Sequence, residues 1–456
     1  MPMNEIVERQ REFFRAGNTR PYAYRQKMLQ QLEKQVRKYD KEIQAALHQD
    51  LHKSGGEAFM TEIGLSLSEI NHVRKHLKNW MRVKKVRAPL THFPAYGTVR
   101  PEPYGVVLIM APWNYPFLLN IEPLCDAIAA GNCCILKPSA YAPATSALLK
   151  KMIGEVFPPE YITVIEGGRE ENELLLEQRF DYIFFTGSPG VGKLVMEKAA
   201  AHLTPVTLEL GGKSPCIVER TADINQAAKR IVFGKFINCG QTCVAPDYVL
   251  VHSEIKDEFI KALRKWITDF WGEHPLENPD YPRMISEKHF RRAAGLLGEG
   301  RIVAGGETDE GKLQITPTII DGVKWNYRIM GEEIFGPILP VLEYRSLTET
   351  VDFLKNKEKP LALYLFTRSR KAKDMVLSEL SFGGGCVNDT LIHLATPYMG
   401  FGGVGNSGMG AYHGKTGFDT FSHRKSILHR GLHPDIPVRY PGYGGTKDKI
   451  IRRLLR

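Results

Sequence analysis

Several familiar features are missing from this 456-residue sequence. No run of about 18 consecutive apolar residues occurs, so the chain is not expected to cross a membrane. The seven cysteines form no Cys-x-x-Cys pair, and residues 1–10 are polar and charged, unlike a secretory signal. These absences predict a cytoplasmic protein with free thiols.

Metal-binding and nucleic-acid-binding patterns are also missing. None of the fourteen histidines stands at metal-ligand spacing, and the pair Cys239 and Cys243 lacks further ligands, so no metal site is expected. The net charge is +10, but the basic residues are spread along the chain with only short clusters. This distribution favours a generally basic surface, suited to an anionic cofactor, and no nucleic-acid partner is expected.

The composition is typical of a globular protein, and the length is sufficient for two or three domains. From about residue 105 onward, short apolar runs alternate with helical segments. Such alternation predicts a parallel sheet, and uniformly apolar runs indicate strands covered on both faces. We therefore predict an α/β fold with a Rossmann-like domain that binds a nucleotide at the carboxyl ends of its strands. The expected strands are 105–110, 133–136, 162–165, 182–185 and 206–210.

The remaining segments are predicted to form further parts of the molecule. A second alternation after residue 211, with strands expected at 248–251, 316–320 and 340–343, predicts a second α/β domain. Residues 1–81 are expected to be helical, whereas residues 82–105 are basic, proline-rich and extended. The tail from 448 to 456 is basic and amphipathic, so weak peripheral contact with an anionic membrane surface is a further expectation.

Cys243 is the first candidate for chemistry. It lies between a helical run and a strand-like run, in a segment that contains Gly240 and Pro246, and a thiol at such a junction can reach a substrate. Upstream, Glu209 is a lone carboxylate between apolar neighbours. A nucleophilic thiol and a carboxylate in apolar surroundings are components of covalent catalysis. Taken alone, however, a free cysteine is more often a small buried hydrophobic residue.

Other polar residues follow predicted strands. Asn114 can donate its amide to an oxyanion, although an asparagine in a turn is commonly structural. The glycines of segment 186–192 open a helix and let the backbone approach a phosphate, but the segment matches neither the Gly-x-Gly-x-x-Gly fingerprint nor a P-loop, and a plain tight turn is the alternative. Lys137 can reach a ribose or phosphate, and Glu333 precedes an aromatic residue; surface charge is the simpler explanation for both.

Together these motifs resemble the NAD(P)-dependent aldehyde dehydrogenase superfamily over nearly the whole chain. The motifs occur in the family's order and at its spacing, and they are Pro112-Trp113-Asn114, Lys137-Pro138-Ser139, Phe185-Thr186-Gly187-Ser188 with Gly192, Glu209-Leu210-Gly211-Gly212-Lys213, Gly240-Gln241-Thr242-Cys243 and Glu333-Ile334-Phe335-Gly336-Pro337. Segments 243–248 and 405–424 are similar to the class 3 type, which includes enzymes that oxidise fatty and aromatic aldehydes.

The resemblance implies a role for each matching residue. Cys243 would attack the aldehyde as a thiolate, and the Asn114 amide and the Cys243 N–H would hold the oxyanion. Hydride transfer to the nicotinamide would leave a thioester, which Glu209 would help to hydrolyse by activating water. Contacts with the cofactor are implied for Lys137, Thr186, Gly187, Ser188, Gly192, Glu333 and Phe335.

The resemblance also implies how the chain is divided. Residues 1–81 and 106–210 would form the cofactor-binding domain, and residues 211–392 the catalytic domain. Residues 82–105 and 393–456 would form a bridging or oligomerisation arm and the C-terminal tail of a homodimer.

One departure from the family bears on the cofactor. Many relatives carry a glutamate after the Lys-Pro-Ser segment, where it binds the ribose hydroxyls and repels a 2′-phosphate, but this chain has Ala140 there. The loss of that carboxylate should relax discrimination against NADP. We therefore expect that both NAD and NADP are used.

Two other functions fit parts of the sequence. CoA-acylating aldehyde dehydrogenases resemble this chain but usually lack the glutamate base, so Glu209 argues against that activity. A non-catalytic structural relative would not need Cys243, Glu209 and Asn114 together. We therefore expect an enzyme that oxidises medium- or long-chain aliphatic or aromatic aldehydes to carboxylic acids.

Overall fold

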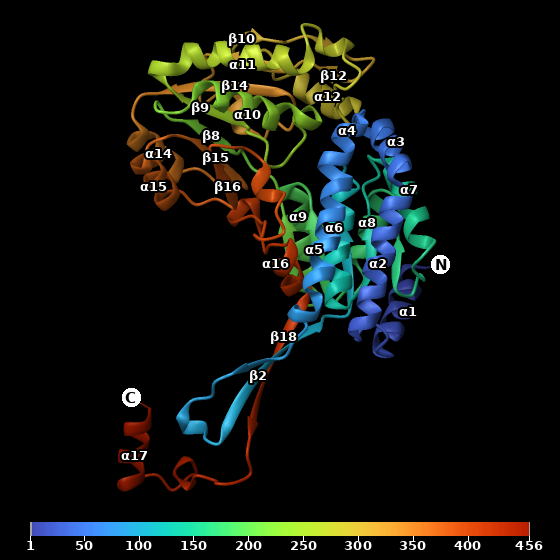
Figure 1. Cartoon of the computed structure of the whole chain (residues 1–456), viewed down its shortest axis with the longest axis vertical. Coiled ribbons are helices and arrows are strands. Elements are labelled where there is room, and N and C mark those ends of the chain that lie inside the picture. Colours follow the sequence, from blue (N-terminus) through green and yellow to red (C-terminus); the bar gives the residue numbers. More distant parts are fainter. Residues whose placement is uncertain (1, 456) are drawn as a thin grey trace.

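The computed structural model describes residues 2–455, which form two α/β lobes and an extended arm (Figure 1). The first lobe contains a six-stranded sheet in the order β17-β7-β6-β3-β4-β5, in which only β17 runs antiparallel to its neighbour. Its strands are β3 (Val106–Met110), β4 (Cys133–Lys137), β5 (Ile162–Val164), β6 (Tyr182–Thr186), β7 (Val206–Glu209) and β17 (Gly408–Met409). The predicted α/β fold with parallel sheets is confirmed.

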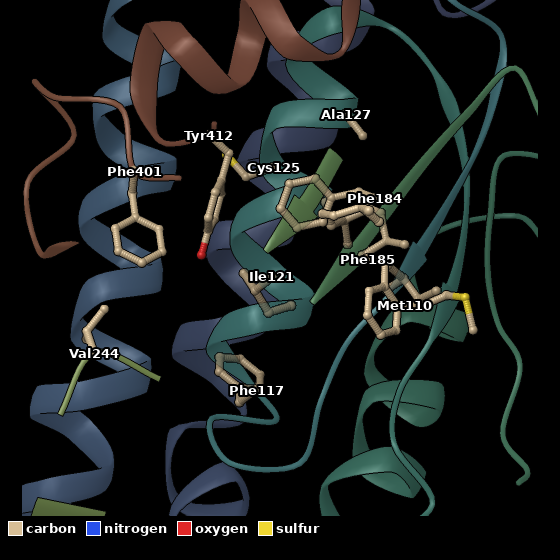
Figure 2. Close-up of a cluster of buried hydrophobic side chains, with 14 of the residues drawn as sticks. Met110, Phe117, Ile121, Cys125, Ala127, Phe184, Phe185, Val244, Phe401 and Tyr412 are labelled. Carbon is tan, nitrogen blue, oxygen red and sulfur yellow. The ribbon is translucent and has the colours of Figure 1, made fainter. Parts of the chain in front are cut away.

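Helices cover this sheet and leave its strands buried. All five residues of β3, Val-Val-Leu-Ile-Met, are buried, as expected for a strand covered on both faces. The helices of this lobe include α1 (Met3–Arg15), α2 (Tyr22–Lys38), α3 (Asp40–Leu51), α5 (Gly64–Trp80), α6 (Leu118–Ala130), α7 (Pro143–Gly154), α8 (Arg169–Leu176) and α9 (Pro189–Ala200). Figure 2 shows Phe117 at the start of α6 and Ile121 and Cys125 on it, with Tyr412 next to Cys125; Phe401 packs against Tyr412 in the same core.

The order of the strands creates a crevice. The chain runs from β3 to β4 and β5 on one side, and then returns to β6 and β7 on the other side of β3. The order therefore reverses between β3 and β6. In open α/β sheets, ligands bind outside the carboxyl ends of the strands at such a reversal.

The second lobe contains a seven-stranded sheet in the order β10-β13-β14-β9-β8-β15-β16, with β10 antiparallel to β13 and the others parallel. Its strands are β8 (Pro215–Val218), β9 (Tyr248–His252), β10 (Arg301–Ala304), β13 (Thr318–Asp321), β14 (Ile338–Tyr344), β15 (Ala362–Phe366) and β16 (Gly384–Val387). The accompanying helices are α10 (Ile224–Phe236), α11 (Lys256–Trp271), α12 (Glu287–Ala294), the short α13 (Arg328–Gly331), α14 (Leu347–Lys355) and α15 (Arg370–Glu379).

The arm extends away from both lobes (Figure 1). It consists of β1 (Lys84–Val86), β2 (Ala95–Pro103) and β18 (Ser422–Arg430), all antiparallel, and α17 (Thr446–Leu454) lies at its far end. The segment after residue 393 does not belong to the arm alone. Its strand β17 completes the first sheet, and α16 (Gly414–Thr420) packs against α5 and α6.

Within residues 2–455, no helix is both long enough and apolar enough to cross a membrane. In the same range, no group of three or more His, Cys, Asp or Glu side chains is arranged to hold a metal ion. The seven cysteines are free thiols.

Candidate active site

A cleft of about 680 Å³ lies at the carboxyl ends of β3, β4, β6 and β7, and the second lobe supplies its opposite wall. It brings together residues predicted separately from the sequence, namely Asn114, Lys137, Thr186, Gly187, Ser188, Glu209, Cys243, Glu333 and Phe335. Gly192 does not line the cleft. A Cβ atom on Gly192 would lie 2.6 Å from Cδ2 of Leu210, so this glycine lets α9 approach the residue that follows Glu209.

The Cys243 loop has an unusual backbone. After α10, Asn238 and Cys239 adopt left-handed φ values of 51° and 53°, and Gly240 has a φ of 70°. Only glycine fits at position 240, because a Cβ atom there would lie 2.3 Å from the carbonyl oxygen of Gly336. Gln241 fixes the loop, since its side chain donates to the Asn238 carbonyl and accepts from a backbone N–H, each at 3.0 Å. The half-buried thiol of Cys243 therefore stands on a defined turn.

Asn114 is bound to the same loop. Its buried side-chain amide donates to the Gln241 carbonyl at 3.0 Å, and its own carbonyl accepts from the Asn238 amide at 2.7 Å. A primary amide has two N–H donors, so the second can serve an oxyanion formed at Cys243. Asn114 is thus tied to the Cys243 loop although it comes from the other lobe.

Glu209 ends β7 with its side chain almost fully buried. Neither carboxyl oxygen has a hydrogen-bond partner among the described residues, and burial raises its pKa well above the usual range. Its backbone carbonyl accepts from Gly187 at 2.9 Å, which ties the strand end to the loop that opens α9. A buried carboxyl group that faces a cleft without protein partners is suited to bind and activate a water molecule.

The electrostatics of the site keep the Cys243 thiol neutral. Burial first, and then the carboxyl groups of Glu333 and Glu209, raise the pKa of the Cys243 thiol to about 12, although the N–H groups of Cys243 and Val244 favour the thiolate. The thiol is therefore protonated at neutral pH in this structure. It needs a base, or a change in its surroundings, before it can act as a nucleophile.

Glu333 lies on the opposite wall, in a loop held by Arg292. The Arg292 guanidinium donates to the backbone carbonyls of Glu333, at 3.1 Å, and of Ile334. Burial raises the pKa of the Glu333 carboxyl group to about 8. Phe335, at a left-handed φ of 46°, packs edge-on against Trp113 with ring centroids 5.4 Å apart. This aromatic pair joins the two walls of the cleft.

The cleft fits a nicotinamide cofactor. Gly187 and Ser188 stand at the N-terminus of α9, where N–H groups favour phosphate, and the buried Thr186 hydroxyl has no partner among the described residues. Lys137, buried at the end of β4, donates to the carbonyls of Pro138 and Gly167 at 3.0 and 2.7 Å. Phosphate-binding backbone, a lysine and a carboxylate thus line one continuous surface.

Sequence reasoning did not single out two features of this site. Arg292 lies in α12, where no local pattern distinguishes it from a solvent-exposed arginine. Lys53 and Glu62 form a buried ion pair whose lysine donates to the Asn114 carbonyl at 3.1 Å. The periodic pattern of helical residues contains no signal for such a contact across 61 positions of sequence.

Comparisons with known proteins agree with this geometry. The model of the aldehyde dehydrogenase family matches residues 2–427. The chain is 50% identical over 446 residues to 4,4'-diaponeurosporen-aldehyde dehydrogenase of Staphylococcus aureus, covering 97% of each chain. It is 47% identical to aldehyde dehydrogenase family 3 member B1 of Bos taurus, covering 99% of this chain and 97% of that one. A solved structure of Staphylococcus aureus AldH in its substrate-bound state superposes with a TM-score of 0.98, at 48% identity and full coverage of both chains.

Proposed function

Because the chain belongs to the aldehyde dehydrogenase family and is similar to its class 3 members, we propose that it oxidises hydrophobic aldehydes to carboxylic acids with NAD(P)+. The observation that carries the proposal is that Cys243, Asn114 and Glu209 line one cleft although they come from two lobes. Trp113, Leu119 and Phe335 add apolar surface to that cleft, which supports a medium- or long-chain aliphatic or an aromatic substrate. The Staphylococcus aureus relative, named for an aldehyde, supports the same reaction.

In the proposed reaction, the Cys243 thiol first loses its proton to solvent water in the cleft, and the resulting thiolate attacks the aldehyde carbon. The Asn114 amide, which lies at the Cys243 loop, and the Cys243 N–H hold the resulting oxyanion. A bound nicotinamide supplies the hydride acceptor for oxidation to the thioester. Glu209 then removes a proton from the water that hydrolyses the thioester, so that Cys243 is free for another cycle.

The cofactor side of the cleft supports the use of both NAD and NADP. Ala140, which follows the Lys-Pro-Ser segment, is exposed at the lining and places no carboxylate there. Arg169 also lines this part of the cleft, where its exposed guanidinium pairs with Glu173 at 2.9 Å and keeps further N–H donors. A 2′-phosphate therefore meets no repulsive side chain from Ala140 and a favourable one from Arg169.

Purified wild-type, Cys243→Ala and Cys386→Ala proteins test the proposal by nicotinamide absorbance with medium-chain and aromatic aldehydes. Turnover should disappear only in Cys243→Ala, because Cys386, the other half-buried thiol, lies outside the cleft lining. NADP should support a catalytic efficiency at least comparable to that with NAD. Turnover that survives in Cys243→Ala would contradict the mechanism, and a strong preference for NAD would contradict dual use. Turnover that requires CoA would favour the acylating alternative.

A homodimer in the cytoplasm is part of the same proposal. The arm exposes large apolar side chains, including Leu90 at 86% and Phe93 at 56%, and β1 and β18 are open edge strands. A second copy of the chain is a suitable cover for such edges and apolar groups. The seven free thiols fit a reducing compartment.

Weak contact of the tail with membranes completes the proposal. Helix α17 has no buried residue and combines exposed Ile450 and Leu454 with four basic side chains, Lys447, Lys449, Arg452 and Arg453. A basic amphipathic helix of this kind binds anionic bilayers weakly. Sedimentation with anionic and neutral vesicles, with and without residues 440–456, tests this contact: only the complete chain with anionic vesicles should sediment.

A further inference from the structure

A fully buried ion pair, which the proposed reaction does not use, lies behind Asn114. The Lys53 ammonium nitrogen is 2.6 Å from Oε1 of Glu62, and neither side chain is exposed. Lys53 also donates to the backbone carbonyl of Asn114 at 3.1 Å. The other carboxyl oxygen of Glu62 accepts the backbone N–H groups of Phe117 and Leu118 at 2.9 and 3.1 Å. One ion pair thus binds both ends of the segment that carries Asn114 into α6.

Stability alone is a weak reason for this arrangement. Burying two charges costs free energy, and apolar replacements of a buried pair are often neutral or stabilising. In this protein the charges of Lys53 and Glu62 contact the segment around Asn114 and restrain its position. Lys53 lies 4.0 Å from the centre of the Tyr115 ring, and the Tyr115 hydroxyl is 2.6 Å from the hydroxyl of Thr242, the residue before Cys243. The ammonium therefore contacts two neighbouring residues of the segment that faces the nucleophile.

A second carboxyl group from the same part of the chain binds the Cys243 loop. Oε1 of Glu57 accepts the backbone N–H of Asn238 at 2.8 Å. Asn238 is the left-handed residue at the start of that loop, and its side-chain amide donates to the carbonyls of Asn114, at 2.7 Å, and Gln241, at 3.1 Å. Glu57 therefore fixes the loop from one side, while Lys53 fixes Asn114 from the other.

A π-helical turn lets Glu57 and Glu62 act together. Residues Phe59–Ile63 form this turn between α4 (Gly55–Ala58) and α5. In an uninterrupted α-helix, residues five apart would point about 140° away from each other. A turn with i→i+5 hydrogen bonding contains one more residue, which brings both carboxyl groups to the side that faces residues 114–118 and 238. Such turns frequently occur at functional sites.

We propose that Lys53, Glu57 and Glu62 are positioning residues that hold Asn114 and the Cys243 loop in register for the oxyanion. None of the three lines the cleft, so they act through Asn114 and the loop. The inference rests on the proposed function, because it assigns the oxyanion to the Asn114 amide. A displacement of about 1 Å at such a donor can reduce the rate on the order of 100-fold.

The test uses the neutral double variant Lys53→Met/Glu62→Gln, which removes both buried charges together and retains side-chain volume. We expect kcat to fall at least about tenfold while the dissociation constant of the cofactor stays within about threefold of wild type. The matched control is Lys38→Met/Glu155→Gln, a lysine–glutamate pair at 2.7 Å on the surface of the same lobe. This control should retain wild-type kcat.

The decisive comparison repeats the double variant in an Asn114→Ala background. If the pair acts through Asn114, the two losses are not additive, and the double variant adds less than about threefold to the effect of Asn114→Ala. If the ion pair had only a structural role, the fold losses in kcat of the two sets of substitutions would multiply in full, and that result would overturn the inference. Wild-type kcat in the double variant would overturn it as well.

Glu57→Ala provides a second test that keeps the buried pair intact. It removes the acceptor of the Asn238 N–H, so kcat should fall about tenfold or more with unchanged cofactor binding. If the double variant does not fold, Glu57→Ala is used instead. Its loss of kcat is then measured with and without Asn114→Ala, and the same additivity criterion applies. Lack of aldehyde oxidation by the wild-type protein would instead refute the proposed function, so the two failures are distinguishable.

Discussion

At the scale of the residue, the carboxyl groups that serve the proposed reaction also restrain its nucleophile. Glu333 and Glu209 both raise the pKa of the Cys243 thiol, next to the larger effect of burial. The thiol is therefore less reactive in the protein alone than its partial exposure would suggest. The reactivity of the Cys243 thiol therefore depends on the charges of the neighbouring carboxyl groups as well as on its exposure to solvent.

Replacing Glu333 should make Cys243 more reactive. At pH 9 the Glu333 carboxyl group, whose pKa is about 8, is largely ionised, and a negative charge beside a thiol disfavours the thiolate. Glu333→Gln removes that charge, so the pKa of the Cys243 thiol should fall and alkylation by iodoacetamide should accelerate on the order of tenfold. Peptide mass spectrometry locates the alkylated cysteine.

Glu310→Gln is the control for this measurement, because the Glu310 carboxylate pairs with Arg291 at 3.1 Å and neither residue lines the cleft. An unchanged or slower rate in Glu333→Gln would refute the electrostatic explanation.

Single residues differ in how far the sequence could predict them. Cys243, Glu209 and Asn114 could be found because each stands at a break beside a strand or helix, and the cleft brings them together as expected from parallel strands. Lys53 and Glu62 could not be found, because their contacts with Asn114 and Phe117 span more than fifty positions of sequence. A buried charge in a helix is indistinguishable, by local pattern, from a solvated one.

At the scale of the element, the short strand β17 pairs with the end of β7 that carries Glu209, the proposed base. Gly408 pairs with Glu209, and the N–H of Leu210 donates to the Ser407 carbonyl at 3.1 Å. Gly408 has a φ of 146°, and a Cβ atom there would lie 2.2 Å from the Leu208 carbonyl oxygen. Any side chain at position 408 must therefore displace β17 from β7.

Gly408→Ala should consequently lower kcat at least about tenfold, because the end of β7 that carries Glu209 loses its neighbouring strand. It should also reduce the free energy of unfolding by about 1–3 kcal/mol. Steady-state kinetics and chemical denaturation measure the two effects. Gly154→Ala, at a position with no atom within 4 Å of the added Cβ, is the control and should retain both properties. Wild-type kcat in Gly408→Ala would show that Glu209 does not depend on β17.

Strands could be predicted from the sequence where nearly all of their side chains are apolar and buried. Strands β3, β4, β5, β6, β7 and β9 begin and end within one residue of the positions expected from their apolar runs. Strand β8 was not predicted, because it has only four residues and begins with a proline. The π-turn at 59–63 was not predicted either. Apolar residues at three- and four-residue spacing occur on both sides of it, and this pattern does not reveal one inserted residue.

At the scale of the whole molecule, the arm should join two chains. Sedimentation velocity should give about twice the chain mass of 51.5 kDa. Leu90→Glu/Phe93→Glu places charges on the exposed apolar surface of the arm and should yield the single-chain mass, because burying unpaired charges costs free energy. Leu377→Glu, at a residue 45% exposed on α15, is the control. A wild-type protein that sediments as one chain would contradict the dimer.

The division of the chain into domains stays a prediction, but the two lobes explain why the cleft needs the whole molecule. The first lobe supplies Asn114 and Glu209, and the second supplies Cys243 and Glu333. Composition and periodicity predict two α/β parts, yet they do not determine how the parts face each other. That arrangement depends on packing between residues far apart in sequence, as in the core that contains both Phe184 and Val249.

The most direct test of the proposed thioester mechanism is an intact-mass measurement on Glu209→Gln protein mixed with saturating NAD(P)+ and a hydrophobic aldehyde. One acyl group per chain should accumulate on the peptide that contains Cys243, because the thioester forms but its hydrolysis lacks a base. Wild-type protein should show little of it. Formation of the carboxylic acid without acylation of Cys243, or acylation of a different residue, would contradict the proposal that Cys243 carries the thioester.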